Sequence, residues 1–263
     1  MKLKDLLKNV LTGKELELAP SGFDMIGDLA ILKINEELEG KEKKIAEQLL
    51  KLKHIKTVLK KEGKVENEFR VRKYKVIGGE NTKETLHTEY GCRYKLNVEK
   101  VYFSPRLGNE RERITNQVKD GEKILVMFAG IGPYAIQIAK NREVKIWGVE
   151  INPEGIKYFK ENAKLNKVEN KIKIFEGDVR EIVPKLKEKF DRIIMPLPKD
   201  AETFLDVAKK VSKKNTIIHL YIFADSKKEA IEKIGENVRV LNCVECGGYS
   251  KITSRYCIDF RFK

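Results

Sequence analysis

The sequence predicts an α/β protein in which a small α+β region precedes a larger domain built on a mostly parallel sheet. From about residue 109 onward, short apolar runs alternate with segments of helical periodicity, which is typical of βαβ units. Before residue 92, apolar or alternating runs are separated by turns and include one helical stretch, which favours a mostly antiparallel sheet. We therefore predict a small domain over residues 1–92 and a larger domain over residues 93–263.

The elements expected in the small domain follow from the spacing of its apolar residues. Ile45, Leu49 and Leu52 recur at helical spacing and predict a helix over residues 41–53. Short apolar or alternating runs predict strands over residues 30–34, 55–59, 69–77 and 94–98.

The larger domain is expected to open with a helix that Asn109 caps, because Glu112 stands three residues later in a capping-box pattern. This helix should end near Asp120 and Gly121. The strands expected after it span residues 123–128, 144–149, 172–175, 192–195, 216–223, 238–245 and 251–261. The helices expected between them span residues 134–140, 153–165, 179–186, 201–209 and 226–234. The last two strands should extend the sheet with an antiparallel member.

The charge of the chain indicates a polyanionic partner. Lysine and arginine number 54 against 40 aspartate and glutamate residues, a formal net charge of +14. A heat-adapted surface enriches both signs, so it does not explain the excess, and RNA or DNA is the partner we expect. No apolar run approaches the roughly 20 residues that span a bilayer, and charges interrupt the N-terminal segment. We expect a cytoplasmic protein without a membrane span or an export signal.

The four cysteines do not predict a metal site. Cys92, Cys243, Cys246 and Cys257 are irregularly spaced, which fits a reducing compartment rather than a disulfide framework. Cys243 and Cys246 form a single CxxC pair, whereas a structural zinc needs four ligands. Zinc remains the less favoured alternative, and we expect these thiols to pack in or near the C-terminal strands.

Three successive strand ends carry residues suited to a nucleoside cofactor. Gly130 and Gly132 follow a buried strand and allow a tight turn with close backbone approach. Glu150 ends the next strand and can accept hydrogen bonds from ribose hydroxyls, and Asp178 follows the third strand beside the expected adenine position. Each acid alone is more often a helix cap, but a glycine turn and two acids at three consecutive strand ends together indicate a cofactor site.

Six segments of the larger domain form a recognisable set: YFSPRL at 102–107, ERER at 110–113, MFAGIGP at 127–133, EINP at 150–153, GDVR at 177–180 and DRIIMPLPK at 191–199. With them, residues from about 101 to 225 resemble class I S-adenosylmethionine-dependent methyltransferases, and more narrowly the archaeal and eukaryal enzymes that methylate N1 of guanosine at position 37 of tRNA. Residues 21–32, Phe69-Arg70 and residues 88–92 resemble the middle domain of that family.

The resemblance implies a Rossmann-like methyltransferase domain with a mostly parallel seven-stranded sheet. It implies S-adenosylmethionine as cofactor and the anticodon loop of tRNA as partner, bound by a monomer without metal. It further implies that Glu110 is the general base and that Arg70 positions the target base or stabilises charge on its O6. The implied cofactor contacts are Phe128, Gly130, Gly132, Glu150, Asp178 and Pro196. The implied substrate contacts are Tyr102, Arg106, Arg111, Pro198 and Lys199.

Two departures from the family pattern point to one branch of it. Pro196 stands where the family usually has asparagine, and Glu150 stands where aspartate is common. Together with Pro198, these residues resemble an archaeal branch that also methylates carbon 7 of 4-demethylwyosine at the same tRNA position, giving isowyosine. The predicted activity is therefore N1 methylation of guanosine 37 with a second methylation in the wyosine pathway.

Four other functions stay open at this point. The chain could methylate only the wyosine intermediate, or it could act on another RNA. A methyltransferase for a small molecule or protein would not explain the positive charge. A non-catalytic RNA-binding module would not need the glycines and acids of the cofactor pattern.

Overall fold

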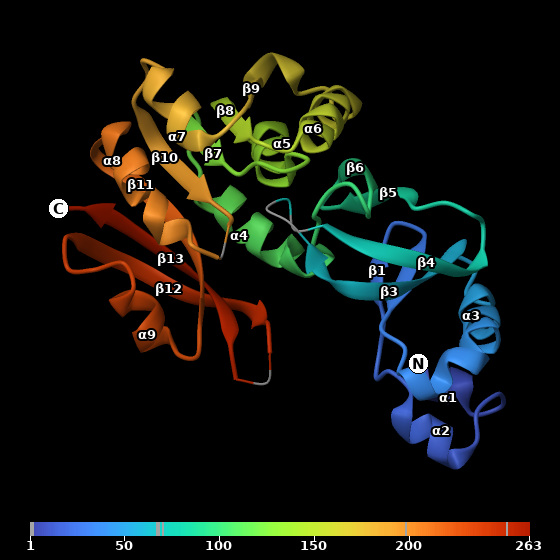
Figure 1. Cartoon of the computed structure of the whole chain (residues 1–263). Coiled ribbons are helices and arrows are strands. Elements are labelled where there is room, and N and C mark those ends of the chain that lie inside the picture. The colour runs from blue at the N-terminus through green and yellow to red at the C-terminus, as the bar shows by residue number, and fades with distance from the viewer. Residues whose placement is uncertain (1–2, 67–68, 70, 198, 251) are drawn as a thin grey trace. The chain divides into compact units, whose positions relative to one another are not determined.

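The computed structural model of the chain describes residues 3–66, 69, 71–197, 199–250 and 252–263 (Figure 1). The chain divides into two compact units, which are described separately. The first unit comprises residues 1–89 and 93–105, and the second comprises residues 90–92 and 106–263. The predicted domain boundary between residues 92 and 93 stays a prediction.

The first unit is an α+β structure built on a four-stranded sheet in the order β1-β2-β3-β4. The pairings β1–β2 and β3–β4 are antiparallel, and β2–β3 is parallel. The strands are β1 (Asp24–Ile26), β2 (Leu29–Leu32), β3 (Thr57–Glu66) and β4 (Val71–Gly79), with β5 (Glu84–Glu89) and β6 (Cys92–Asn97) in a two-stranded sheet. The helices are α1 (Leu3–Leu7), α2 (Gly13–Leu18) and α3 (Glu42–Leu50), with a 3-10 turn over Glu36–Lys41.

The predicted helix over residues 41–53 forms as α3 because one of its faces is apolar. Ile45, Ala46 and Leu49 are buried in one core with Leu32 and Val58 of the sheet. The sequence did not predict α1, α2, β1 or β5. These elements are short, and their apolar spacing is weaker than that of α3.

The second unit is built on a seven-stranded sheet in the order β12-β13-β11-β10-β7-β8-β9. Strands β7 to β11 pair in parallel, and β13 is antiparallel to both β11 and β12. The strands are β7 (Lys123–Met127), β8 (Lys145–Glu150), β9 (Ile172–Glu176), β10 (Phe190–Met195), β11 (Ser212–Ala224), β12 (Val238–Gly248) and β13 (Ser254–Phe262). The helices are α4 (Gly108–Gln117), α5 (Pro133–Asn141), α6 (Pro153–Leu165), α7 (Val179–Ile182), α8 (Leu205–Lys210) and α9 (Lys227–Glu232). The predicted parallel sheet with an antiparallel extension at its end is confirmed.

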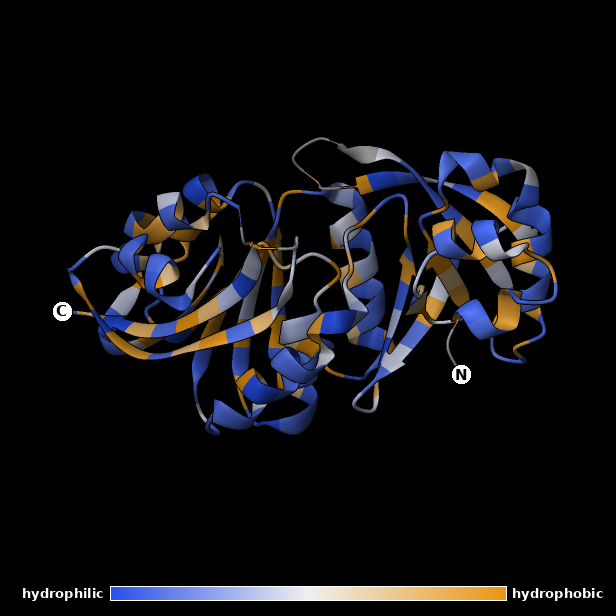
Figure 2. Ribbon diagram, turned by 90° about the horizontal axis from the view of Figure 1, so that it is seen from below, coloured by the Kyte–Doolittle hydropathy of each residue, from blue (hydrophilic) through white to orange (hydrophobic). Residues whose placement is uncertain are grey.

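Alternate residues of the central strands enter separate cores on the two faces of this sheet. On one face, Leu125 and Met127 of β7 lie in one apolar cluster with Phe204 and with Ala230 of α9. On the other face, Gly148 of β8 lies against Phe159 of α6. In Figure 2 both the strands and the helices carry a mixture of apolar and polar residues along their length. The sheet is therefore buried on both sides, as a mostly parallel sheet requires.

The start of α4 differs from the expectation. The helix begins at Gly108 with Leu107 as its N-cap residue, and no side chain caps it. Asn109 instead accepts a hydrogen bond from the Tyr90 hydroxyl at 2.6 Å. The predicted capping box was wrong because Asn109 already lies inside the helix, which ends at Gln117 rather than near residue 120.

Close packing fixes the turn between β7 and α5. Gly132 has a φ of +84° and precedes Pro133, the first residue of α5. A Cβ at Gly132 would lie 2.1 Å from the ring of Phe159, which is fully buried. The turn therefore needs glycine both for its backbone angle and for the space that the ring occupies.

Among the described residues, no helix is long and apolar enough to cross a lipid bilayer.

Gly132→Ala is expected to lower the free energy of unfolding by about 1–3 kcal/mol more than Gly121→Ala, because overpacking adds to the backbone strain. Gly121 is a matched control: its φ is also +84°, but nothing lies within 4 Å of the position of its Cβ. Chemical denaturation of both variants measures the difference. Equal losses would show that Phe159 moves aside without cost.

Candidate active site

The carboxyl-terminal edge of the parallel strands brings together segments that are distant in the sequence. Ile194 of β10 pairs with Val126 of β7 on one side and with His219 of β11 on the other. Phe128 and Pro196 come directly after the last residues of β7 and β10, and Tyr221 lies two residues after His219 in β11. These three positions therefore follow aligned residues of adjacent strands, beside the point where the strand order reverses, which is where α/β sheets bind ligands.

The turn after β7 leaves room beside its backbone. Gly130 has a φ of +57°, and a Cβ built on it would meet no atom within 4 Å. The preceding Phe128 also has a positive φ, +55°, which is uncommon for a side chain of this size. A nucleoside cofactor fits this arrangement, because a ligand can approach the Gly130 backbone without meeting a side chain.

Glu150 ends β8 and closes the same turn. Its carboxylate accepts hydrogen bonds from the backbone N–H of Gly130 at 2.6 Å and from that of Asn152 at 2.8 Å. Burial raises the pKa of Glu150, although these two backbone donors favour its charged form. A carboxylate offers about four lone-pair positions. The backbone N–H of Ile151 also bonds to this carboxylate, so about one position remains to accept a hydrogen bond from a ribose hydroxyl.

Asp178 lies just after β9 and is the N-cap residue of α7. Its side chain accepts a hydrogen bond from the backbone N–H of Arg180 at 2.7 Å. The Arg180 guanidinium lies 3.8 Å from the centre of the Phe204 ring, and that ring packs edge-on against Phe128. Asp178 thus has a structural role as a helix cap, and its predicted contact with the cofactor stays a prediction.

Glu110, in the first turn of α4, is buried, with 6% of its surface exposed. Its Oε1 accepts hydrogen bonds from Arg113 at 2.8 Å and from the Tyr221 hydroxyl at 2.7 Å. Its Oε2 accepts one from Arg113 Nε at 2.7 Å. Glu110 and Arg113 of α4 thus form a bidentate ion pair. Tyr221 joins this pair to β11, near the strand ends that Phe128 and Pro196 follow. Removing one member of such a buried pair costs roughly 3–5 kcal/mol.

A line of buried hydrogen bonds continues from Arg113 across the sheet. Arg113 also binds both carboxylate oxygens of Asp259 on β13, at 2.7 and 3.1 Å. Asp259 bonds to His219 Nδ1 at 2.6 Å, and His219 Nε2 bonds to Arg192 at 2.6 Å. Arg192 ends the line in a bidentate pair with Glu122, at 2.8 and 3.0 Å. Because arginine can only donate, Nε2 of His219 accepts, and Nδ1 carries the proton that it donates to Asp259.

The charges along this line stabilise one another. Burial opposes the ionisation of Asp259, but the hydrogen bonds from His219 and Arg113 outweigh it and lower its pKa. Burial lowers the pKa of His219, and the positive charge of Arg192 lowers it further. Burial also opposes the charge of Arg113, but its bonds to Glu110 and Asp259 raise its pKa. At neutral pH the line therefore holds charged carboxylates and guanidinium groups around a neutral imidazole.

His219, Cys257 and Asp259 place potential metal-ligand atoms within 4.8 Å of one another. Two arginines already occupy these atoms. Arg113 donates to the Cys257 sulfur at 3.3 Å and to Asp259, and Arg192 donates to His219. The cluster thus binds protein cations, which argues against using it for a metal ion.

The other residues predicted from the sequence have different environments. Arg106, in the 3-10 turn Pro105–Leu107, is exposed, whereas Arg111 on α4 is buried, with 2% of its surface exposed. Pro196 is half-buried and Lys199 is exposed. Tyr102, in the first unit, has 41% of its surface exposed. Arg70 and Pro198 lie outside the described residues.

The sequence did not predict the partners of Glu110 or the residues bonded beyond them. Tyr221, His219 and Asp259 lie within the apolar stretches of β11 and β13, and Arg113 stands in the ERER segment that resembles the family. A signal for them exists, since a charged or polar residue within a buried strand must find a partner. Sequence alone does not say which partner, because β11, β13 and α4 are far apart in the chain.

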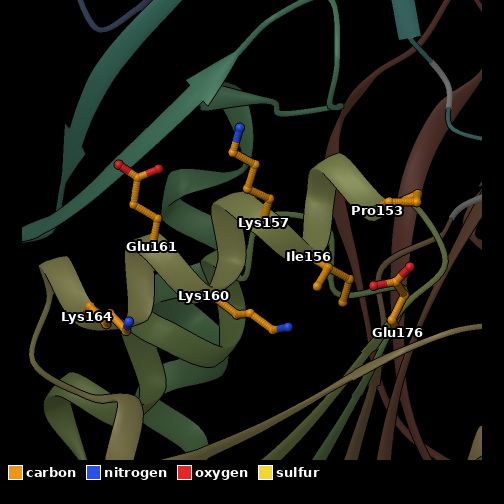
Figure 3. Close-up of a pocket in the computed structure, with 7 residues that line it drawn as sticks. All are labelled: Pro153, Ile156, Lys157, Lys160, Glu161, Lys164 and Glu176. Atoms are coloured by element: carbon orange, nitrogen blue, oxygen red, sulfur yellow. The ribbon is translucent and has the colours of Figure 1, made fainter.

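A pocket of about 490 Å³ lies along α6 and the end of β9. Figure 3 shows Lys157 and Glu161 on one side of α6, and Lys160 extending toward the side where Ile156 and Glu176 lie. Lys164 also lines this pocket, but none of the predicted cofactor residues does. Three lysines and two glutamates line it, so it carries only a small excess of positive charge.

Comparison with known proteins assigns the chain to a family. The TRM5/TYW2 methyltransferase domain matches residues 85–245, and the TYW2 N-terminal domain matches residues 3–82. The chain belongs to the TRM5/TYW2 methyltransferase family. The family resemblance predicted from the sequence is confirmed.

Relatives in this family differ in the group that they transfer. The chain is 42% identical to the tRNA (guanine(37)-N(1))-methyltransferase Trm5b of Pyrococcus abyssi, over 92% of this chain and 75% of the relative. It is 37% identical to the tRNA (guanine(37)-N(1))/4-demethylwyosine(37)-methyltransferase Taw22 of Nanoarchaeum equitans, over 83% and 89%. It is 30% identical to the tRNA(Phe) (4-demethylwyosine(37)-C(7)) aminocarboxypropyltransferase of Pyrococcus horikoshii, over 99% and 96%.

Solved structures of TRM5/TYW2 proteins confirm the predicted fold class. The complex of aTrm5 and tRNALeu matches with a TM-score of 0.89 and 36% identity, over 98% of this chain and 77% of that one. Methanocaldococcus jannaschii Trm5 in complex with adenosine matches with a TM-score of 0.85 and 34% identity, over 99% and 78%. S-adenosylmethionine, the cofactor of this family of methyltransferases, is confirmed as the predicted cofactor.

The low pKa of His219 predicts how stability depends on pH. Below about pH 6.5, the ordinary value for histidine, the unfolded chain binds a proton that folded His219 does not. The free energy of unfolding therefore falls as the pH falls, by at most about 1.4 kcal/mol per pH unit for this one group. Urea unfolding at about pH 7.5 and 5.5 should show a larger loss for the native chain than for His219→Gln. Equal losses in the two proteins would contradict this assignment.

Proposed function

We propose that this protein transfers the methyl group of S-adenosylmethionine to N1 of guanosine at position 37 of tRNA. The observation that carries the proposal is the buried carboxylate of Glu110 at the ligand-binding edge of the sheet. Tyr221 and Arg113 fix its orientation. Its Oε1 accepts hydrogen bonds from Arg113 and Tyr221 and its Oε2 accepts one from Arg113, and we assign the proton from the substrate to Oε2.

N1 of guanine requires such a group. N1 carries a proton, and its lone pair is delocalised into the ring, so N1 becomes a good nucleophile only as the proton leaves. In the proposed step Glu110 Oε2 takes the N1 proton while N1 bonds to the methyl carbon, and the bond between that carbon and the departing sulfur breaks. A positioned general base of this kind contributes about 10²–10⁴-fold to the rate.

The cofactor supplies an electrophilic methyl group on a sulfonium when it is bound. We propose that Glu150 accepts hydrogen bonds from its ribose and that Asp178 lies beside its adenine. The turn with Gly130 and Gly132 would face the methionine portion, and Phe128 and Pro196 would line the same edge. The open space at Gly130 and the remaining acceptor position of Glu150 support this placement.

Five further residues are proposed to hold the anticodon loop, with the target base turned out of its stack. They are Tyr102, Arg106, Arg111, Pro198 and Lys199. We propose Arg70 as the cation that positions guanine or stabilises charge on O6. The chain would act as a cytoplasmic monomer and without a metal ion, which is consistent with the arginines that occupy the His219, Cys257 and Asp259 cluster.

We also propose methylation of carbon 7 of 4-demethylwyosine as a second activity. The Taw22 relative carries both activities in its name and is 37% identical to this chain. Pro196 replaces the amide side chain common in the family and leaves backbone carbonyls to line the base pocket. A pocket lined by carbonyls suits a larger tricyclic base better than a pocket in which an asparagine must bond to exocyclic groups of the base.

Aminocarboxypropyl transfer is a second candidate reaction. The Pyrococcus horikoshii relative covers nearly the same length as this chain, and the TYW2 N-terminal domain matches residues 3–82. Both reactions use one cofactor but break different carbon–sulfur bonds. Methyl transfer leaves S-adenosylhomocysteine, whereas aminocarboxypropyl transfer leaves methylthioadenosine, so the spent cofactor distinguishes them.

The purified protein should convert guanosine 37 of unmodified tRNA to 1-methylguanosine and release S-adenosylhomocysteine. On tRNA with 4-demethylwyosine at position 37 it should form isowyosine. Mass spectrometry of the digested nucleosides and chromatography of the spent cofactor measure both results. Methylthioadenosine as the main product would support aminocarboxypropyl transfer instead, and an unmodified guanosine 37 would refute the proposed function.

Glu150→Ala should weaken the binding of S-adenosylmethionine about tenfold or more, because a lost hydrogen bond to a charged group costs roughly 1.5–3 kcal/mol. Glu176→Ala is the matched control, since Glu176 ends the neighbouring strand in register with Glu150 but is exposed. Calorimetry measures both affinities. The same affinity in the native chain and in Glu150→Ala would remove Glu150 from the cofactor site.

A further inference from the structure

Arg113 is shared between two carboxylates on different elements. It forms a bidentate pair with Glu110 on its own helix, and it also bonds to both oxygens of Asp259 on β13. Gln117, one turn further along α4, donates to Asp259 Oδ2 at 3.3 Å. Asp259 lies directly opposite His219 in the pairing of β13 with β11. The guanidinium of Arg113 is thereby fixed from two sides.

The bonded line from Glu110 to Glu122 carries an excess of negative charge. Three carboxylates, those of Glu110, Asp259 and Glu122, alternate with the two guanidinium groups of Arg113 and Arg192. His219, between Asp259 and Arg192, is neutral because its pKa is lowered by burial and by Arg192. A proton taken up by Glu110 would remove this excess. A single arginine between two acids therefore stabilises the charged form of each acid less than it would stabilise the charged form of one acid alone.

The other ionisable groups around Glu110 stay neutral near neutral pH, apart from Arg111 on its own helix. Tyr134 of α5 and Tyr221 of β11 have pKa values raised by burial and by nearby negative charge. Burial and the charge of Glu110 likewise raise the pKa values of Cys246 on β12 and Cys257 on β13. The electrostatic setting of Glu110 thus depends on Arg111, on Arg113 and on the share of Arg113 that Asp259 takes.

We propose that Arg113 is a positioning residue that holds the Glu110 carboxylate in place for the substrate, and that Asp259 limits how strongly Arg113 stabilises the charge of Glu110. The fork of Arg113 occupies one lone pair on each oxygen, and Tyr221 occupies the second on Oε1. The bonds from Arg113 to Asp259 compete with its bonds to Glu110 for the same guanidinium. The catalytic meaning of this arrangement rests on the proposed N1 methylation, but its electrostatic part does not.

The test measures the titration of Glu110 itself by carbon-13 NMR. The protein is labelled at the glutamate carboxyl carbons, and Glu110→Gln identifies the signal of Glu110. In Arg113→Gln the midpoint of the Glu110 titration should move to higher pH by about one unit or more, because a cation is lost. In Asp259→Asn it should move to lower pH, because Arg113 then serves Glu110 alone. Arg113→Lys keeps the charge and should stay nearer the native midpoint. Unchanged midpoints, or shifts in the same direction for Arg113→Gln and Asp259→Asn, would overturn the proposal.

The same variants give a second readout in single-turnover methylation of guanosine 37. The acidic side of the pH–rate profile should move in the same order as the midpoints. Arg113→Gln should lower the rate about tenfold or more while the affinity for S-adenosylmethionine is kept. Rate losses without any shift of the profile would mean that Arg113 is only structural. Ordered NMR midpoints in a native protein that forms no 1-methylguanosine would refute the proposed function and leave the electrostatic role standing.

Discussion

A line of alternating charges buried between α4 and the sheet is the constraint on which the rest of this site depends. Each member is paired on both sides, from Glu110 through Arg113, Asp259, His219 and Arg192 to Glu122. Buried charges without partners cost several kcal/mol each, so α4, β10, β11 and β13 can pack together only in the register that completes these bonds. The fixed position of Glu110 is a consequence of that register.

The cofactor edge depends on backbone geometry rather than on charge. Gly132 admits the ring of Phe159, and Gly130 leaves open space at the carboxyl end of β7. Glu150 connects the turn to the next strand through two backbone N–H groups. The two halves of the site meet at one level of the sheet, where Phe128 follows β7 and Tyr221 lies in β11. The Gly130 turn and the Glu110 carboxylate are thereby brought to the same edge.

The sequence predicted most of the second unit because its strands and helices have strong periodicity and lie in a simple alternating order. It also singled out Glu150 and Glu110, which stand at recognisable strand and helix ends, and their roles in the site stay predictions. It did not predict that Tyr221 bonds to Glu110, because the two residues are 111 positions apart. The bond of Arg113 to Asp259 joins residues 146 positions apart. The short helices near the N-terminus and the start of α4 were also missed, since local spacing there is weak and Asn109 has a tertiary partner in Tyr90.

The most direct measurement of the central claim is the single-turnover rate of methyl transfer to guanosine 37 in Glu110→Gln, compared with Glu112→Gln. Glu112 lies on the same helix and bonds to Gln137 at 2.7 Å rather than to Arg113. Glu110 is the base in this account, so Glu110→Gln should lose about 10²–10⁴-fold in rate with S-adenosylmethionine still bound, while Glu112→Gln should keep nearly the native rate. A loss of less than about tenfold in Glu110→Gln, or equal losses in the two variants, would contradict the account.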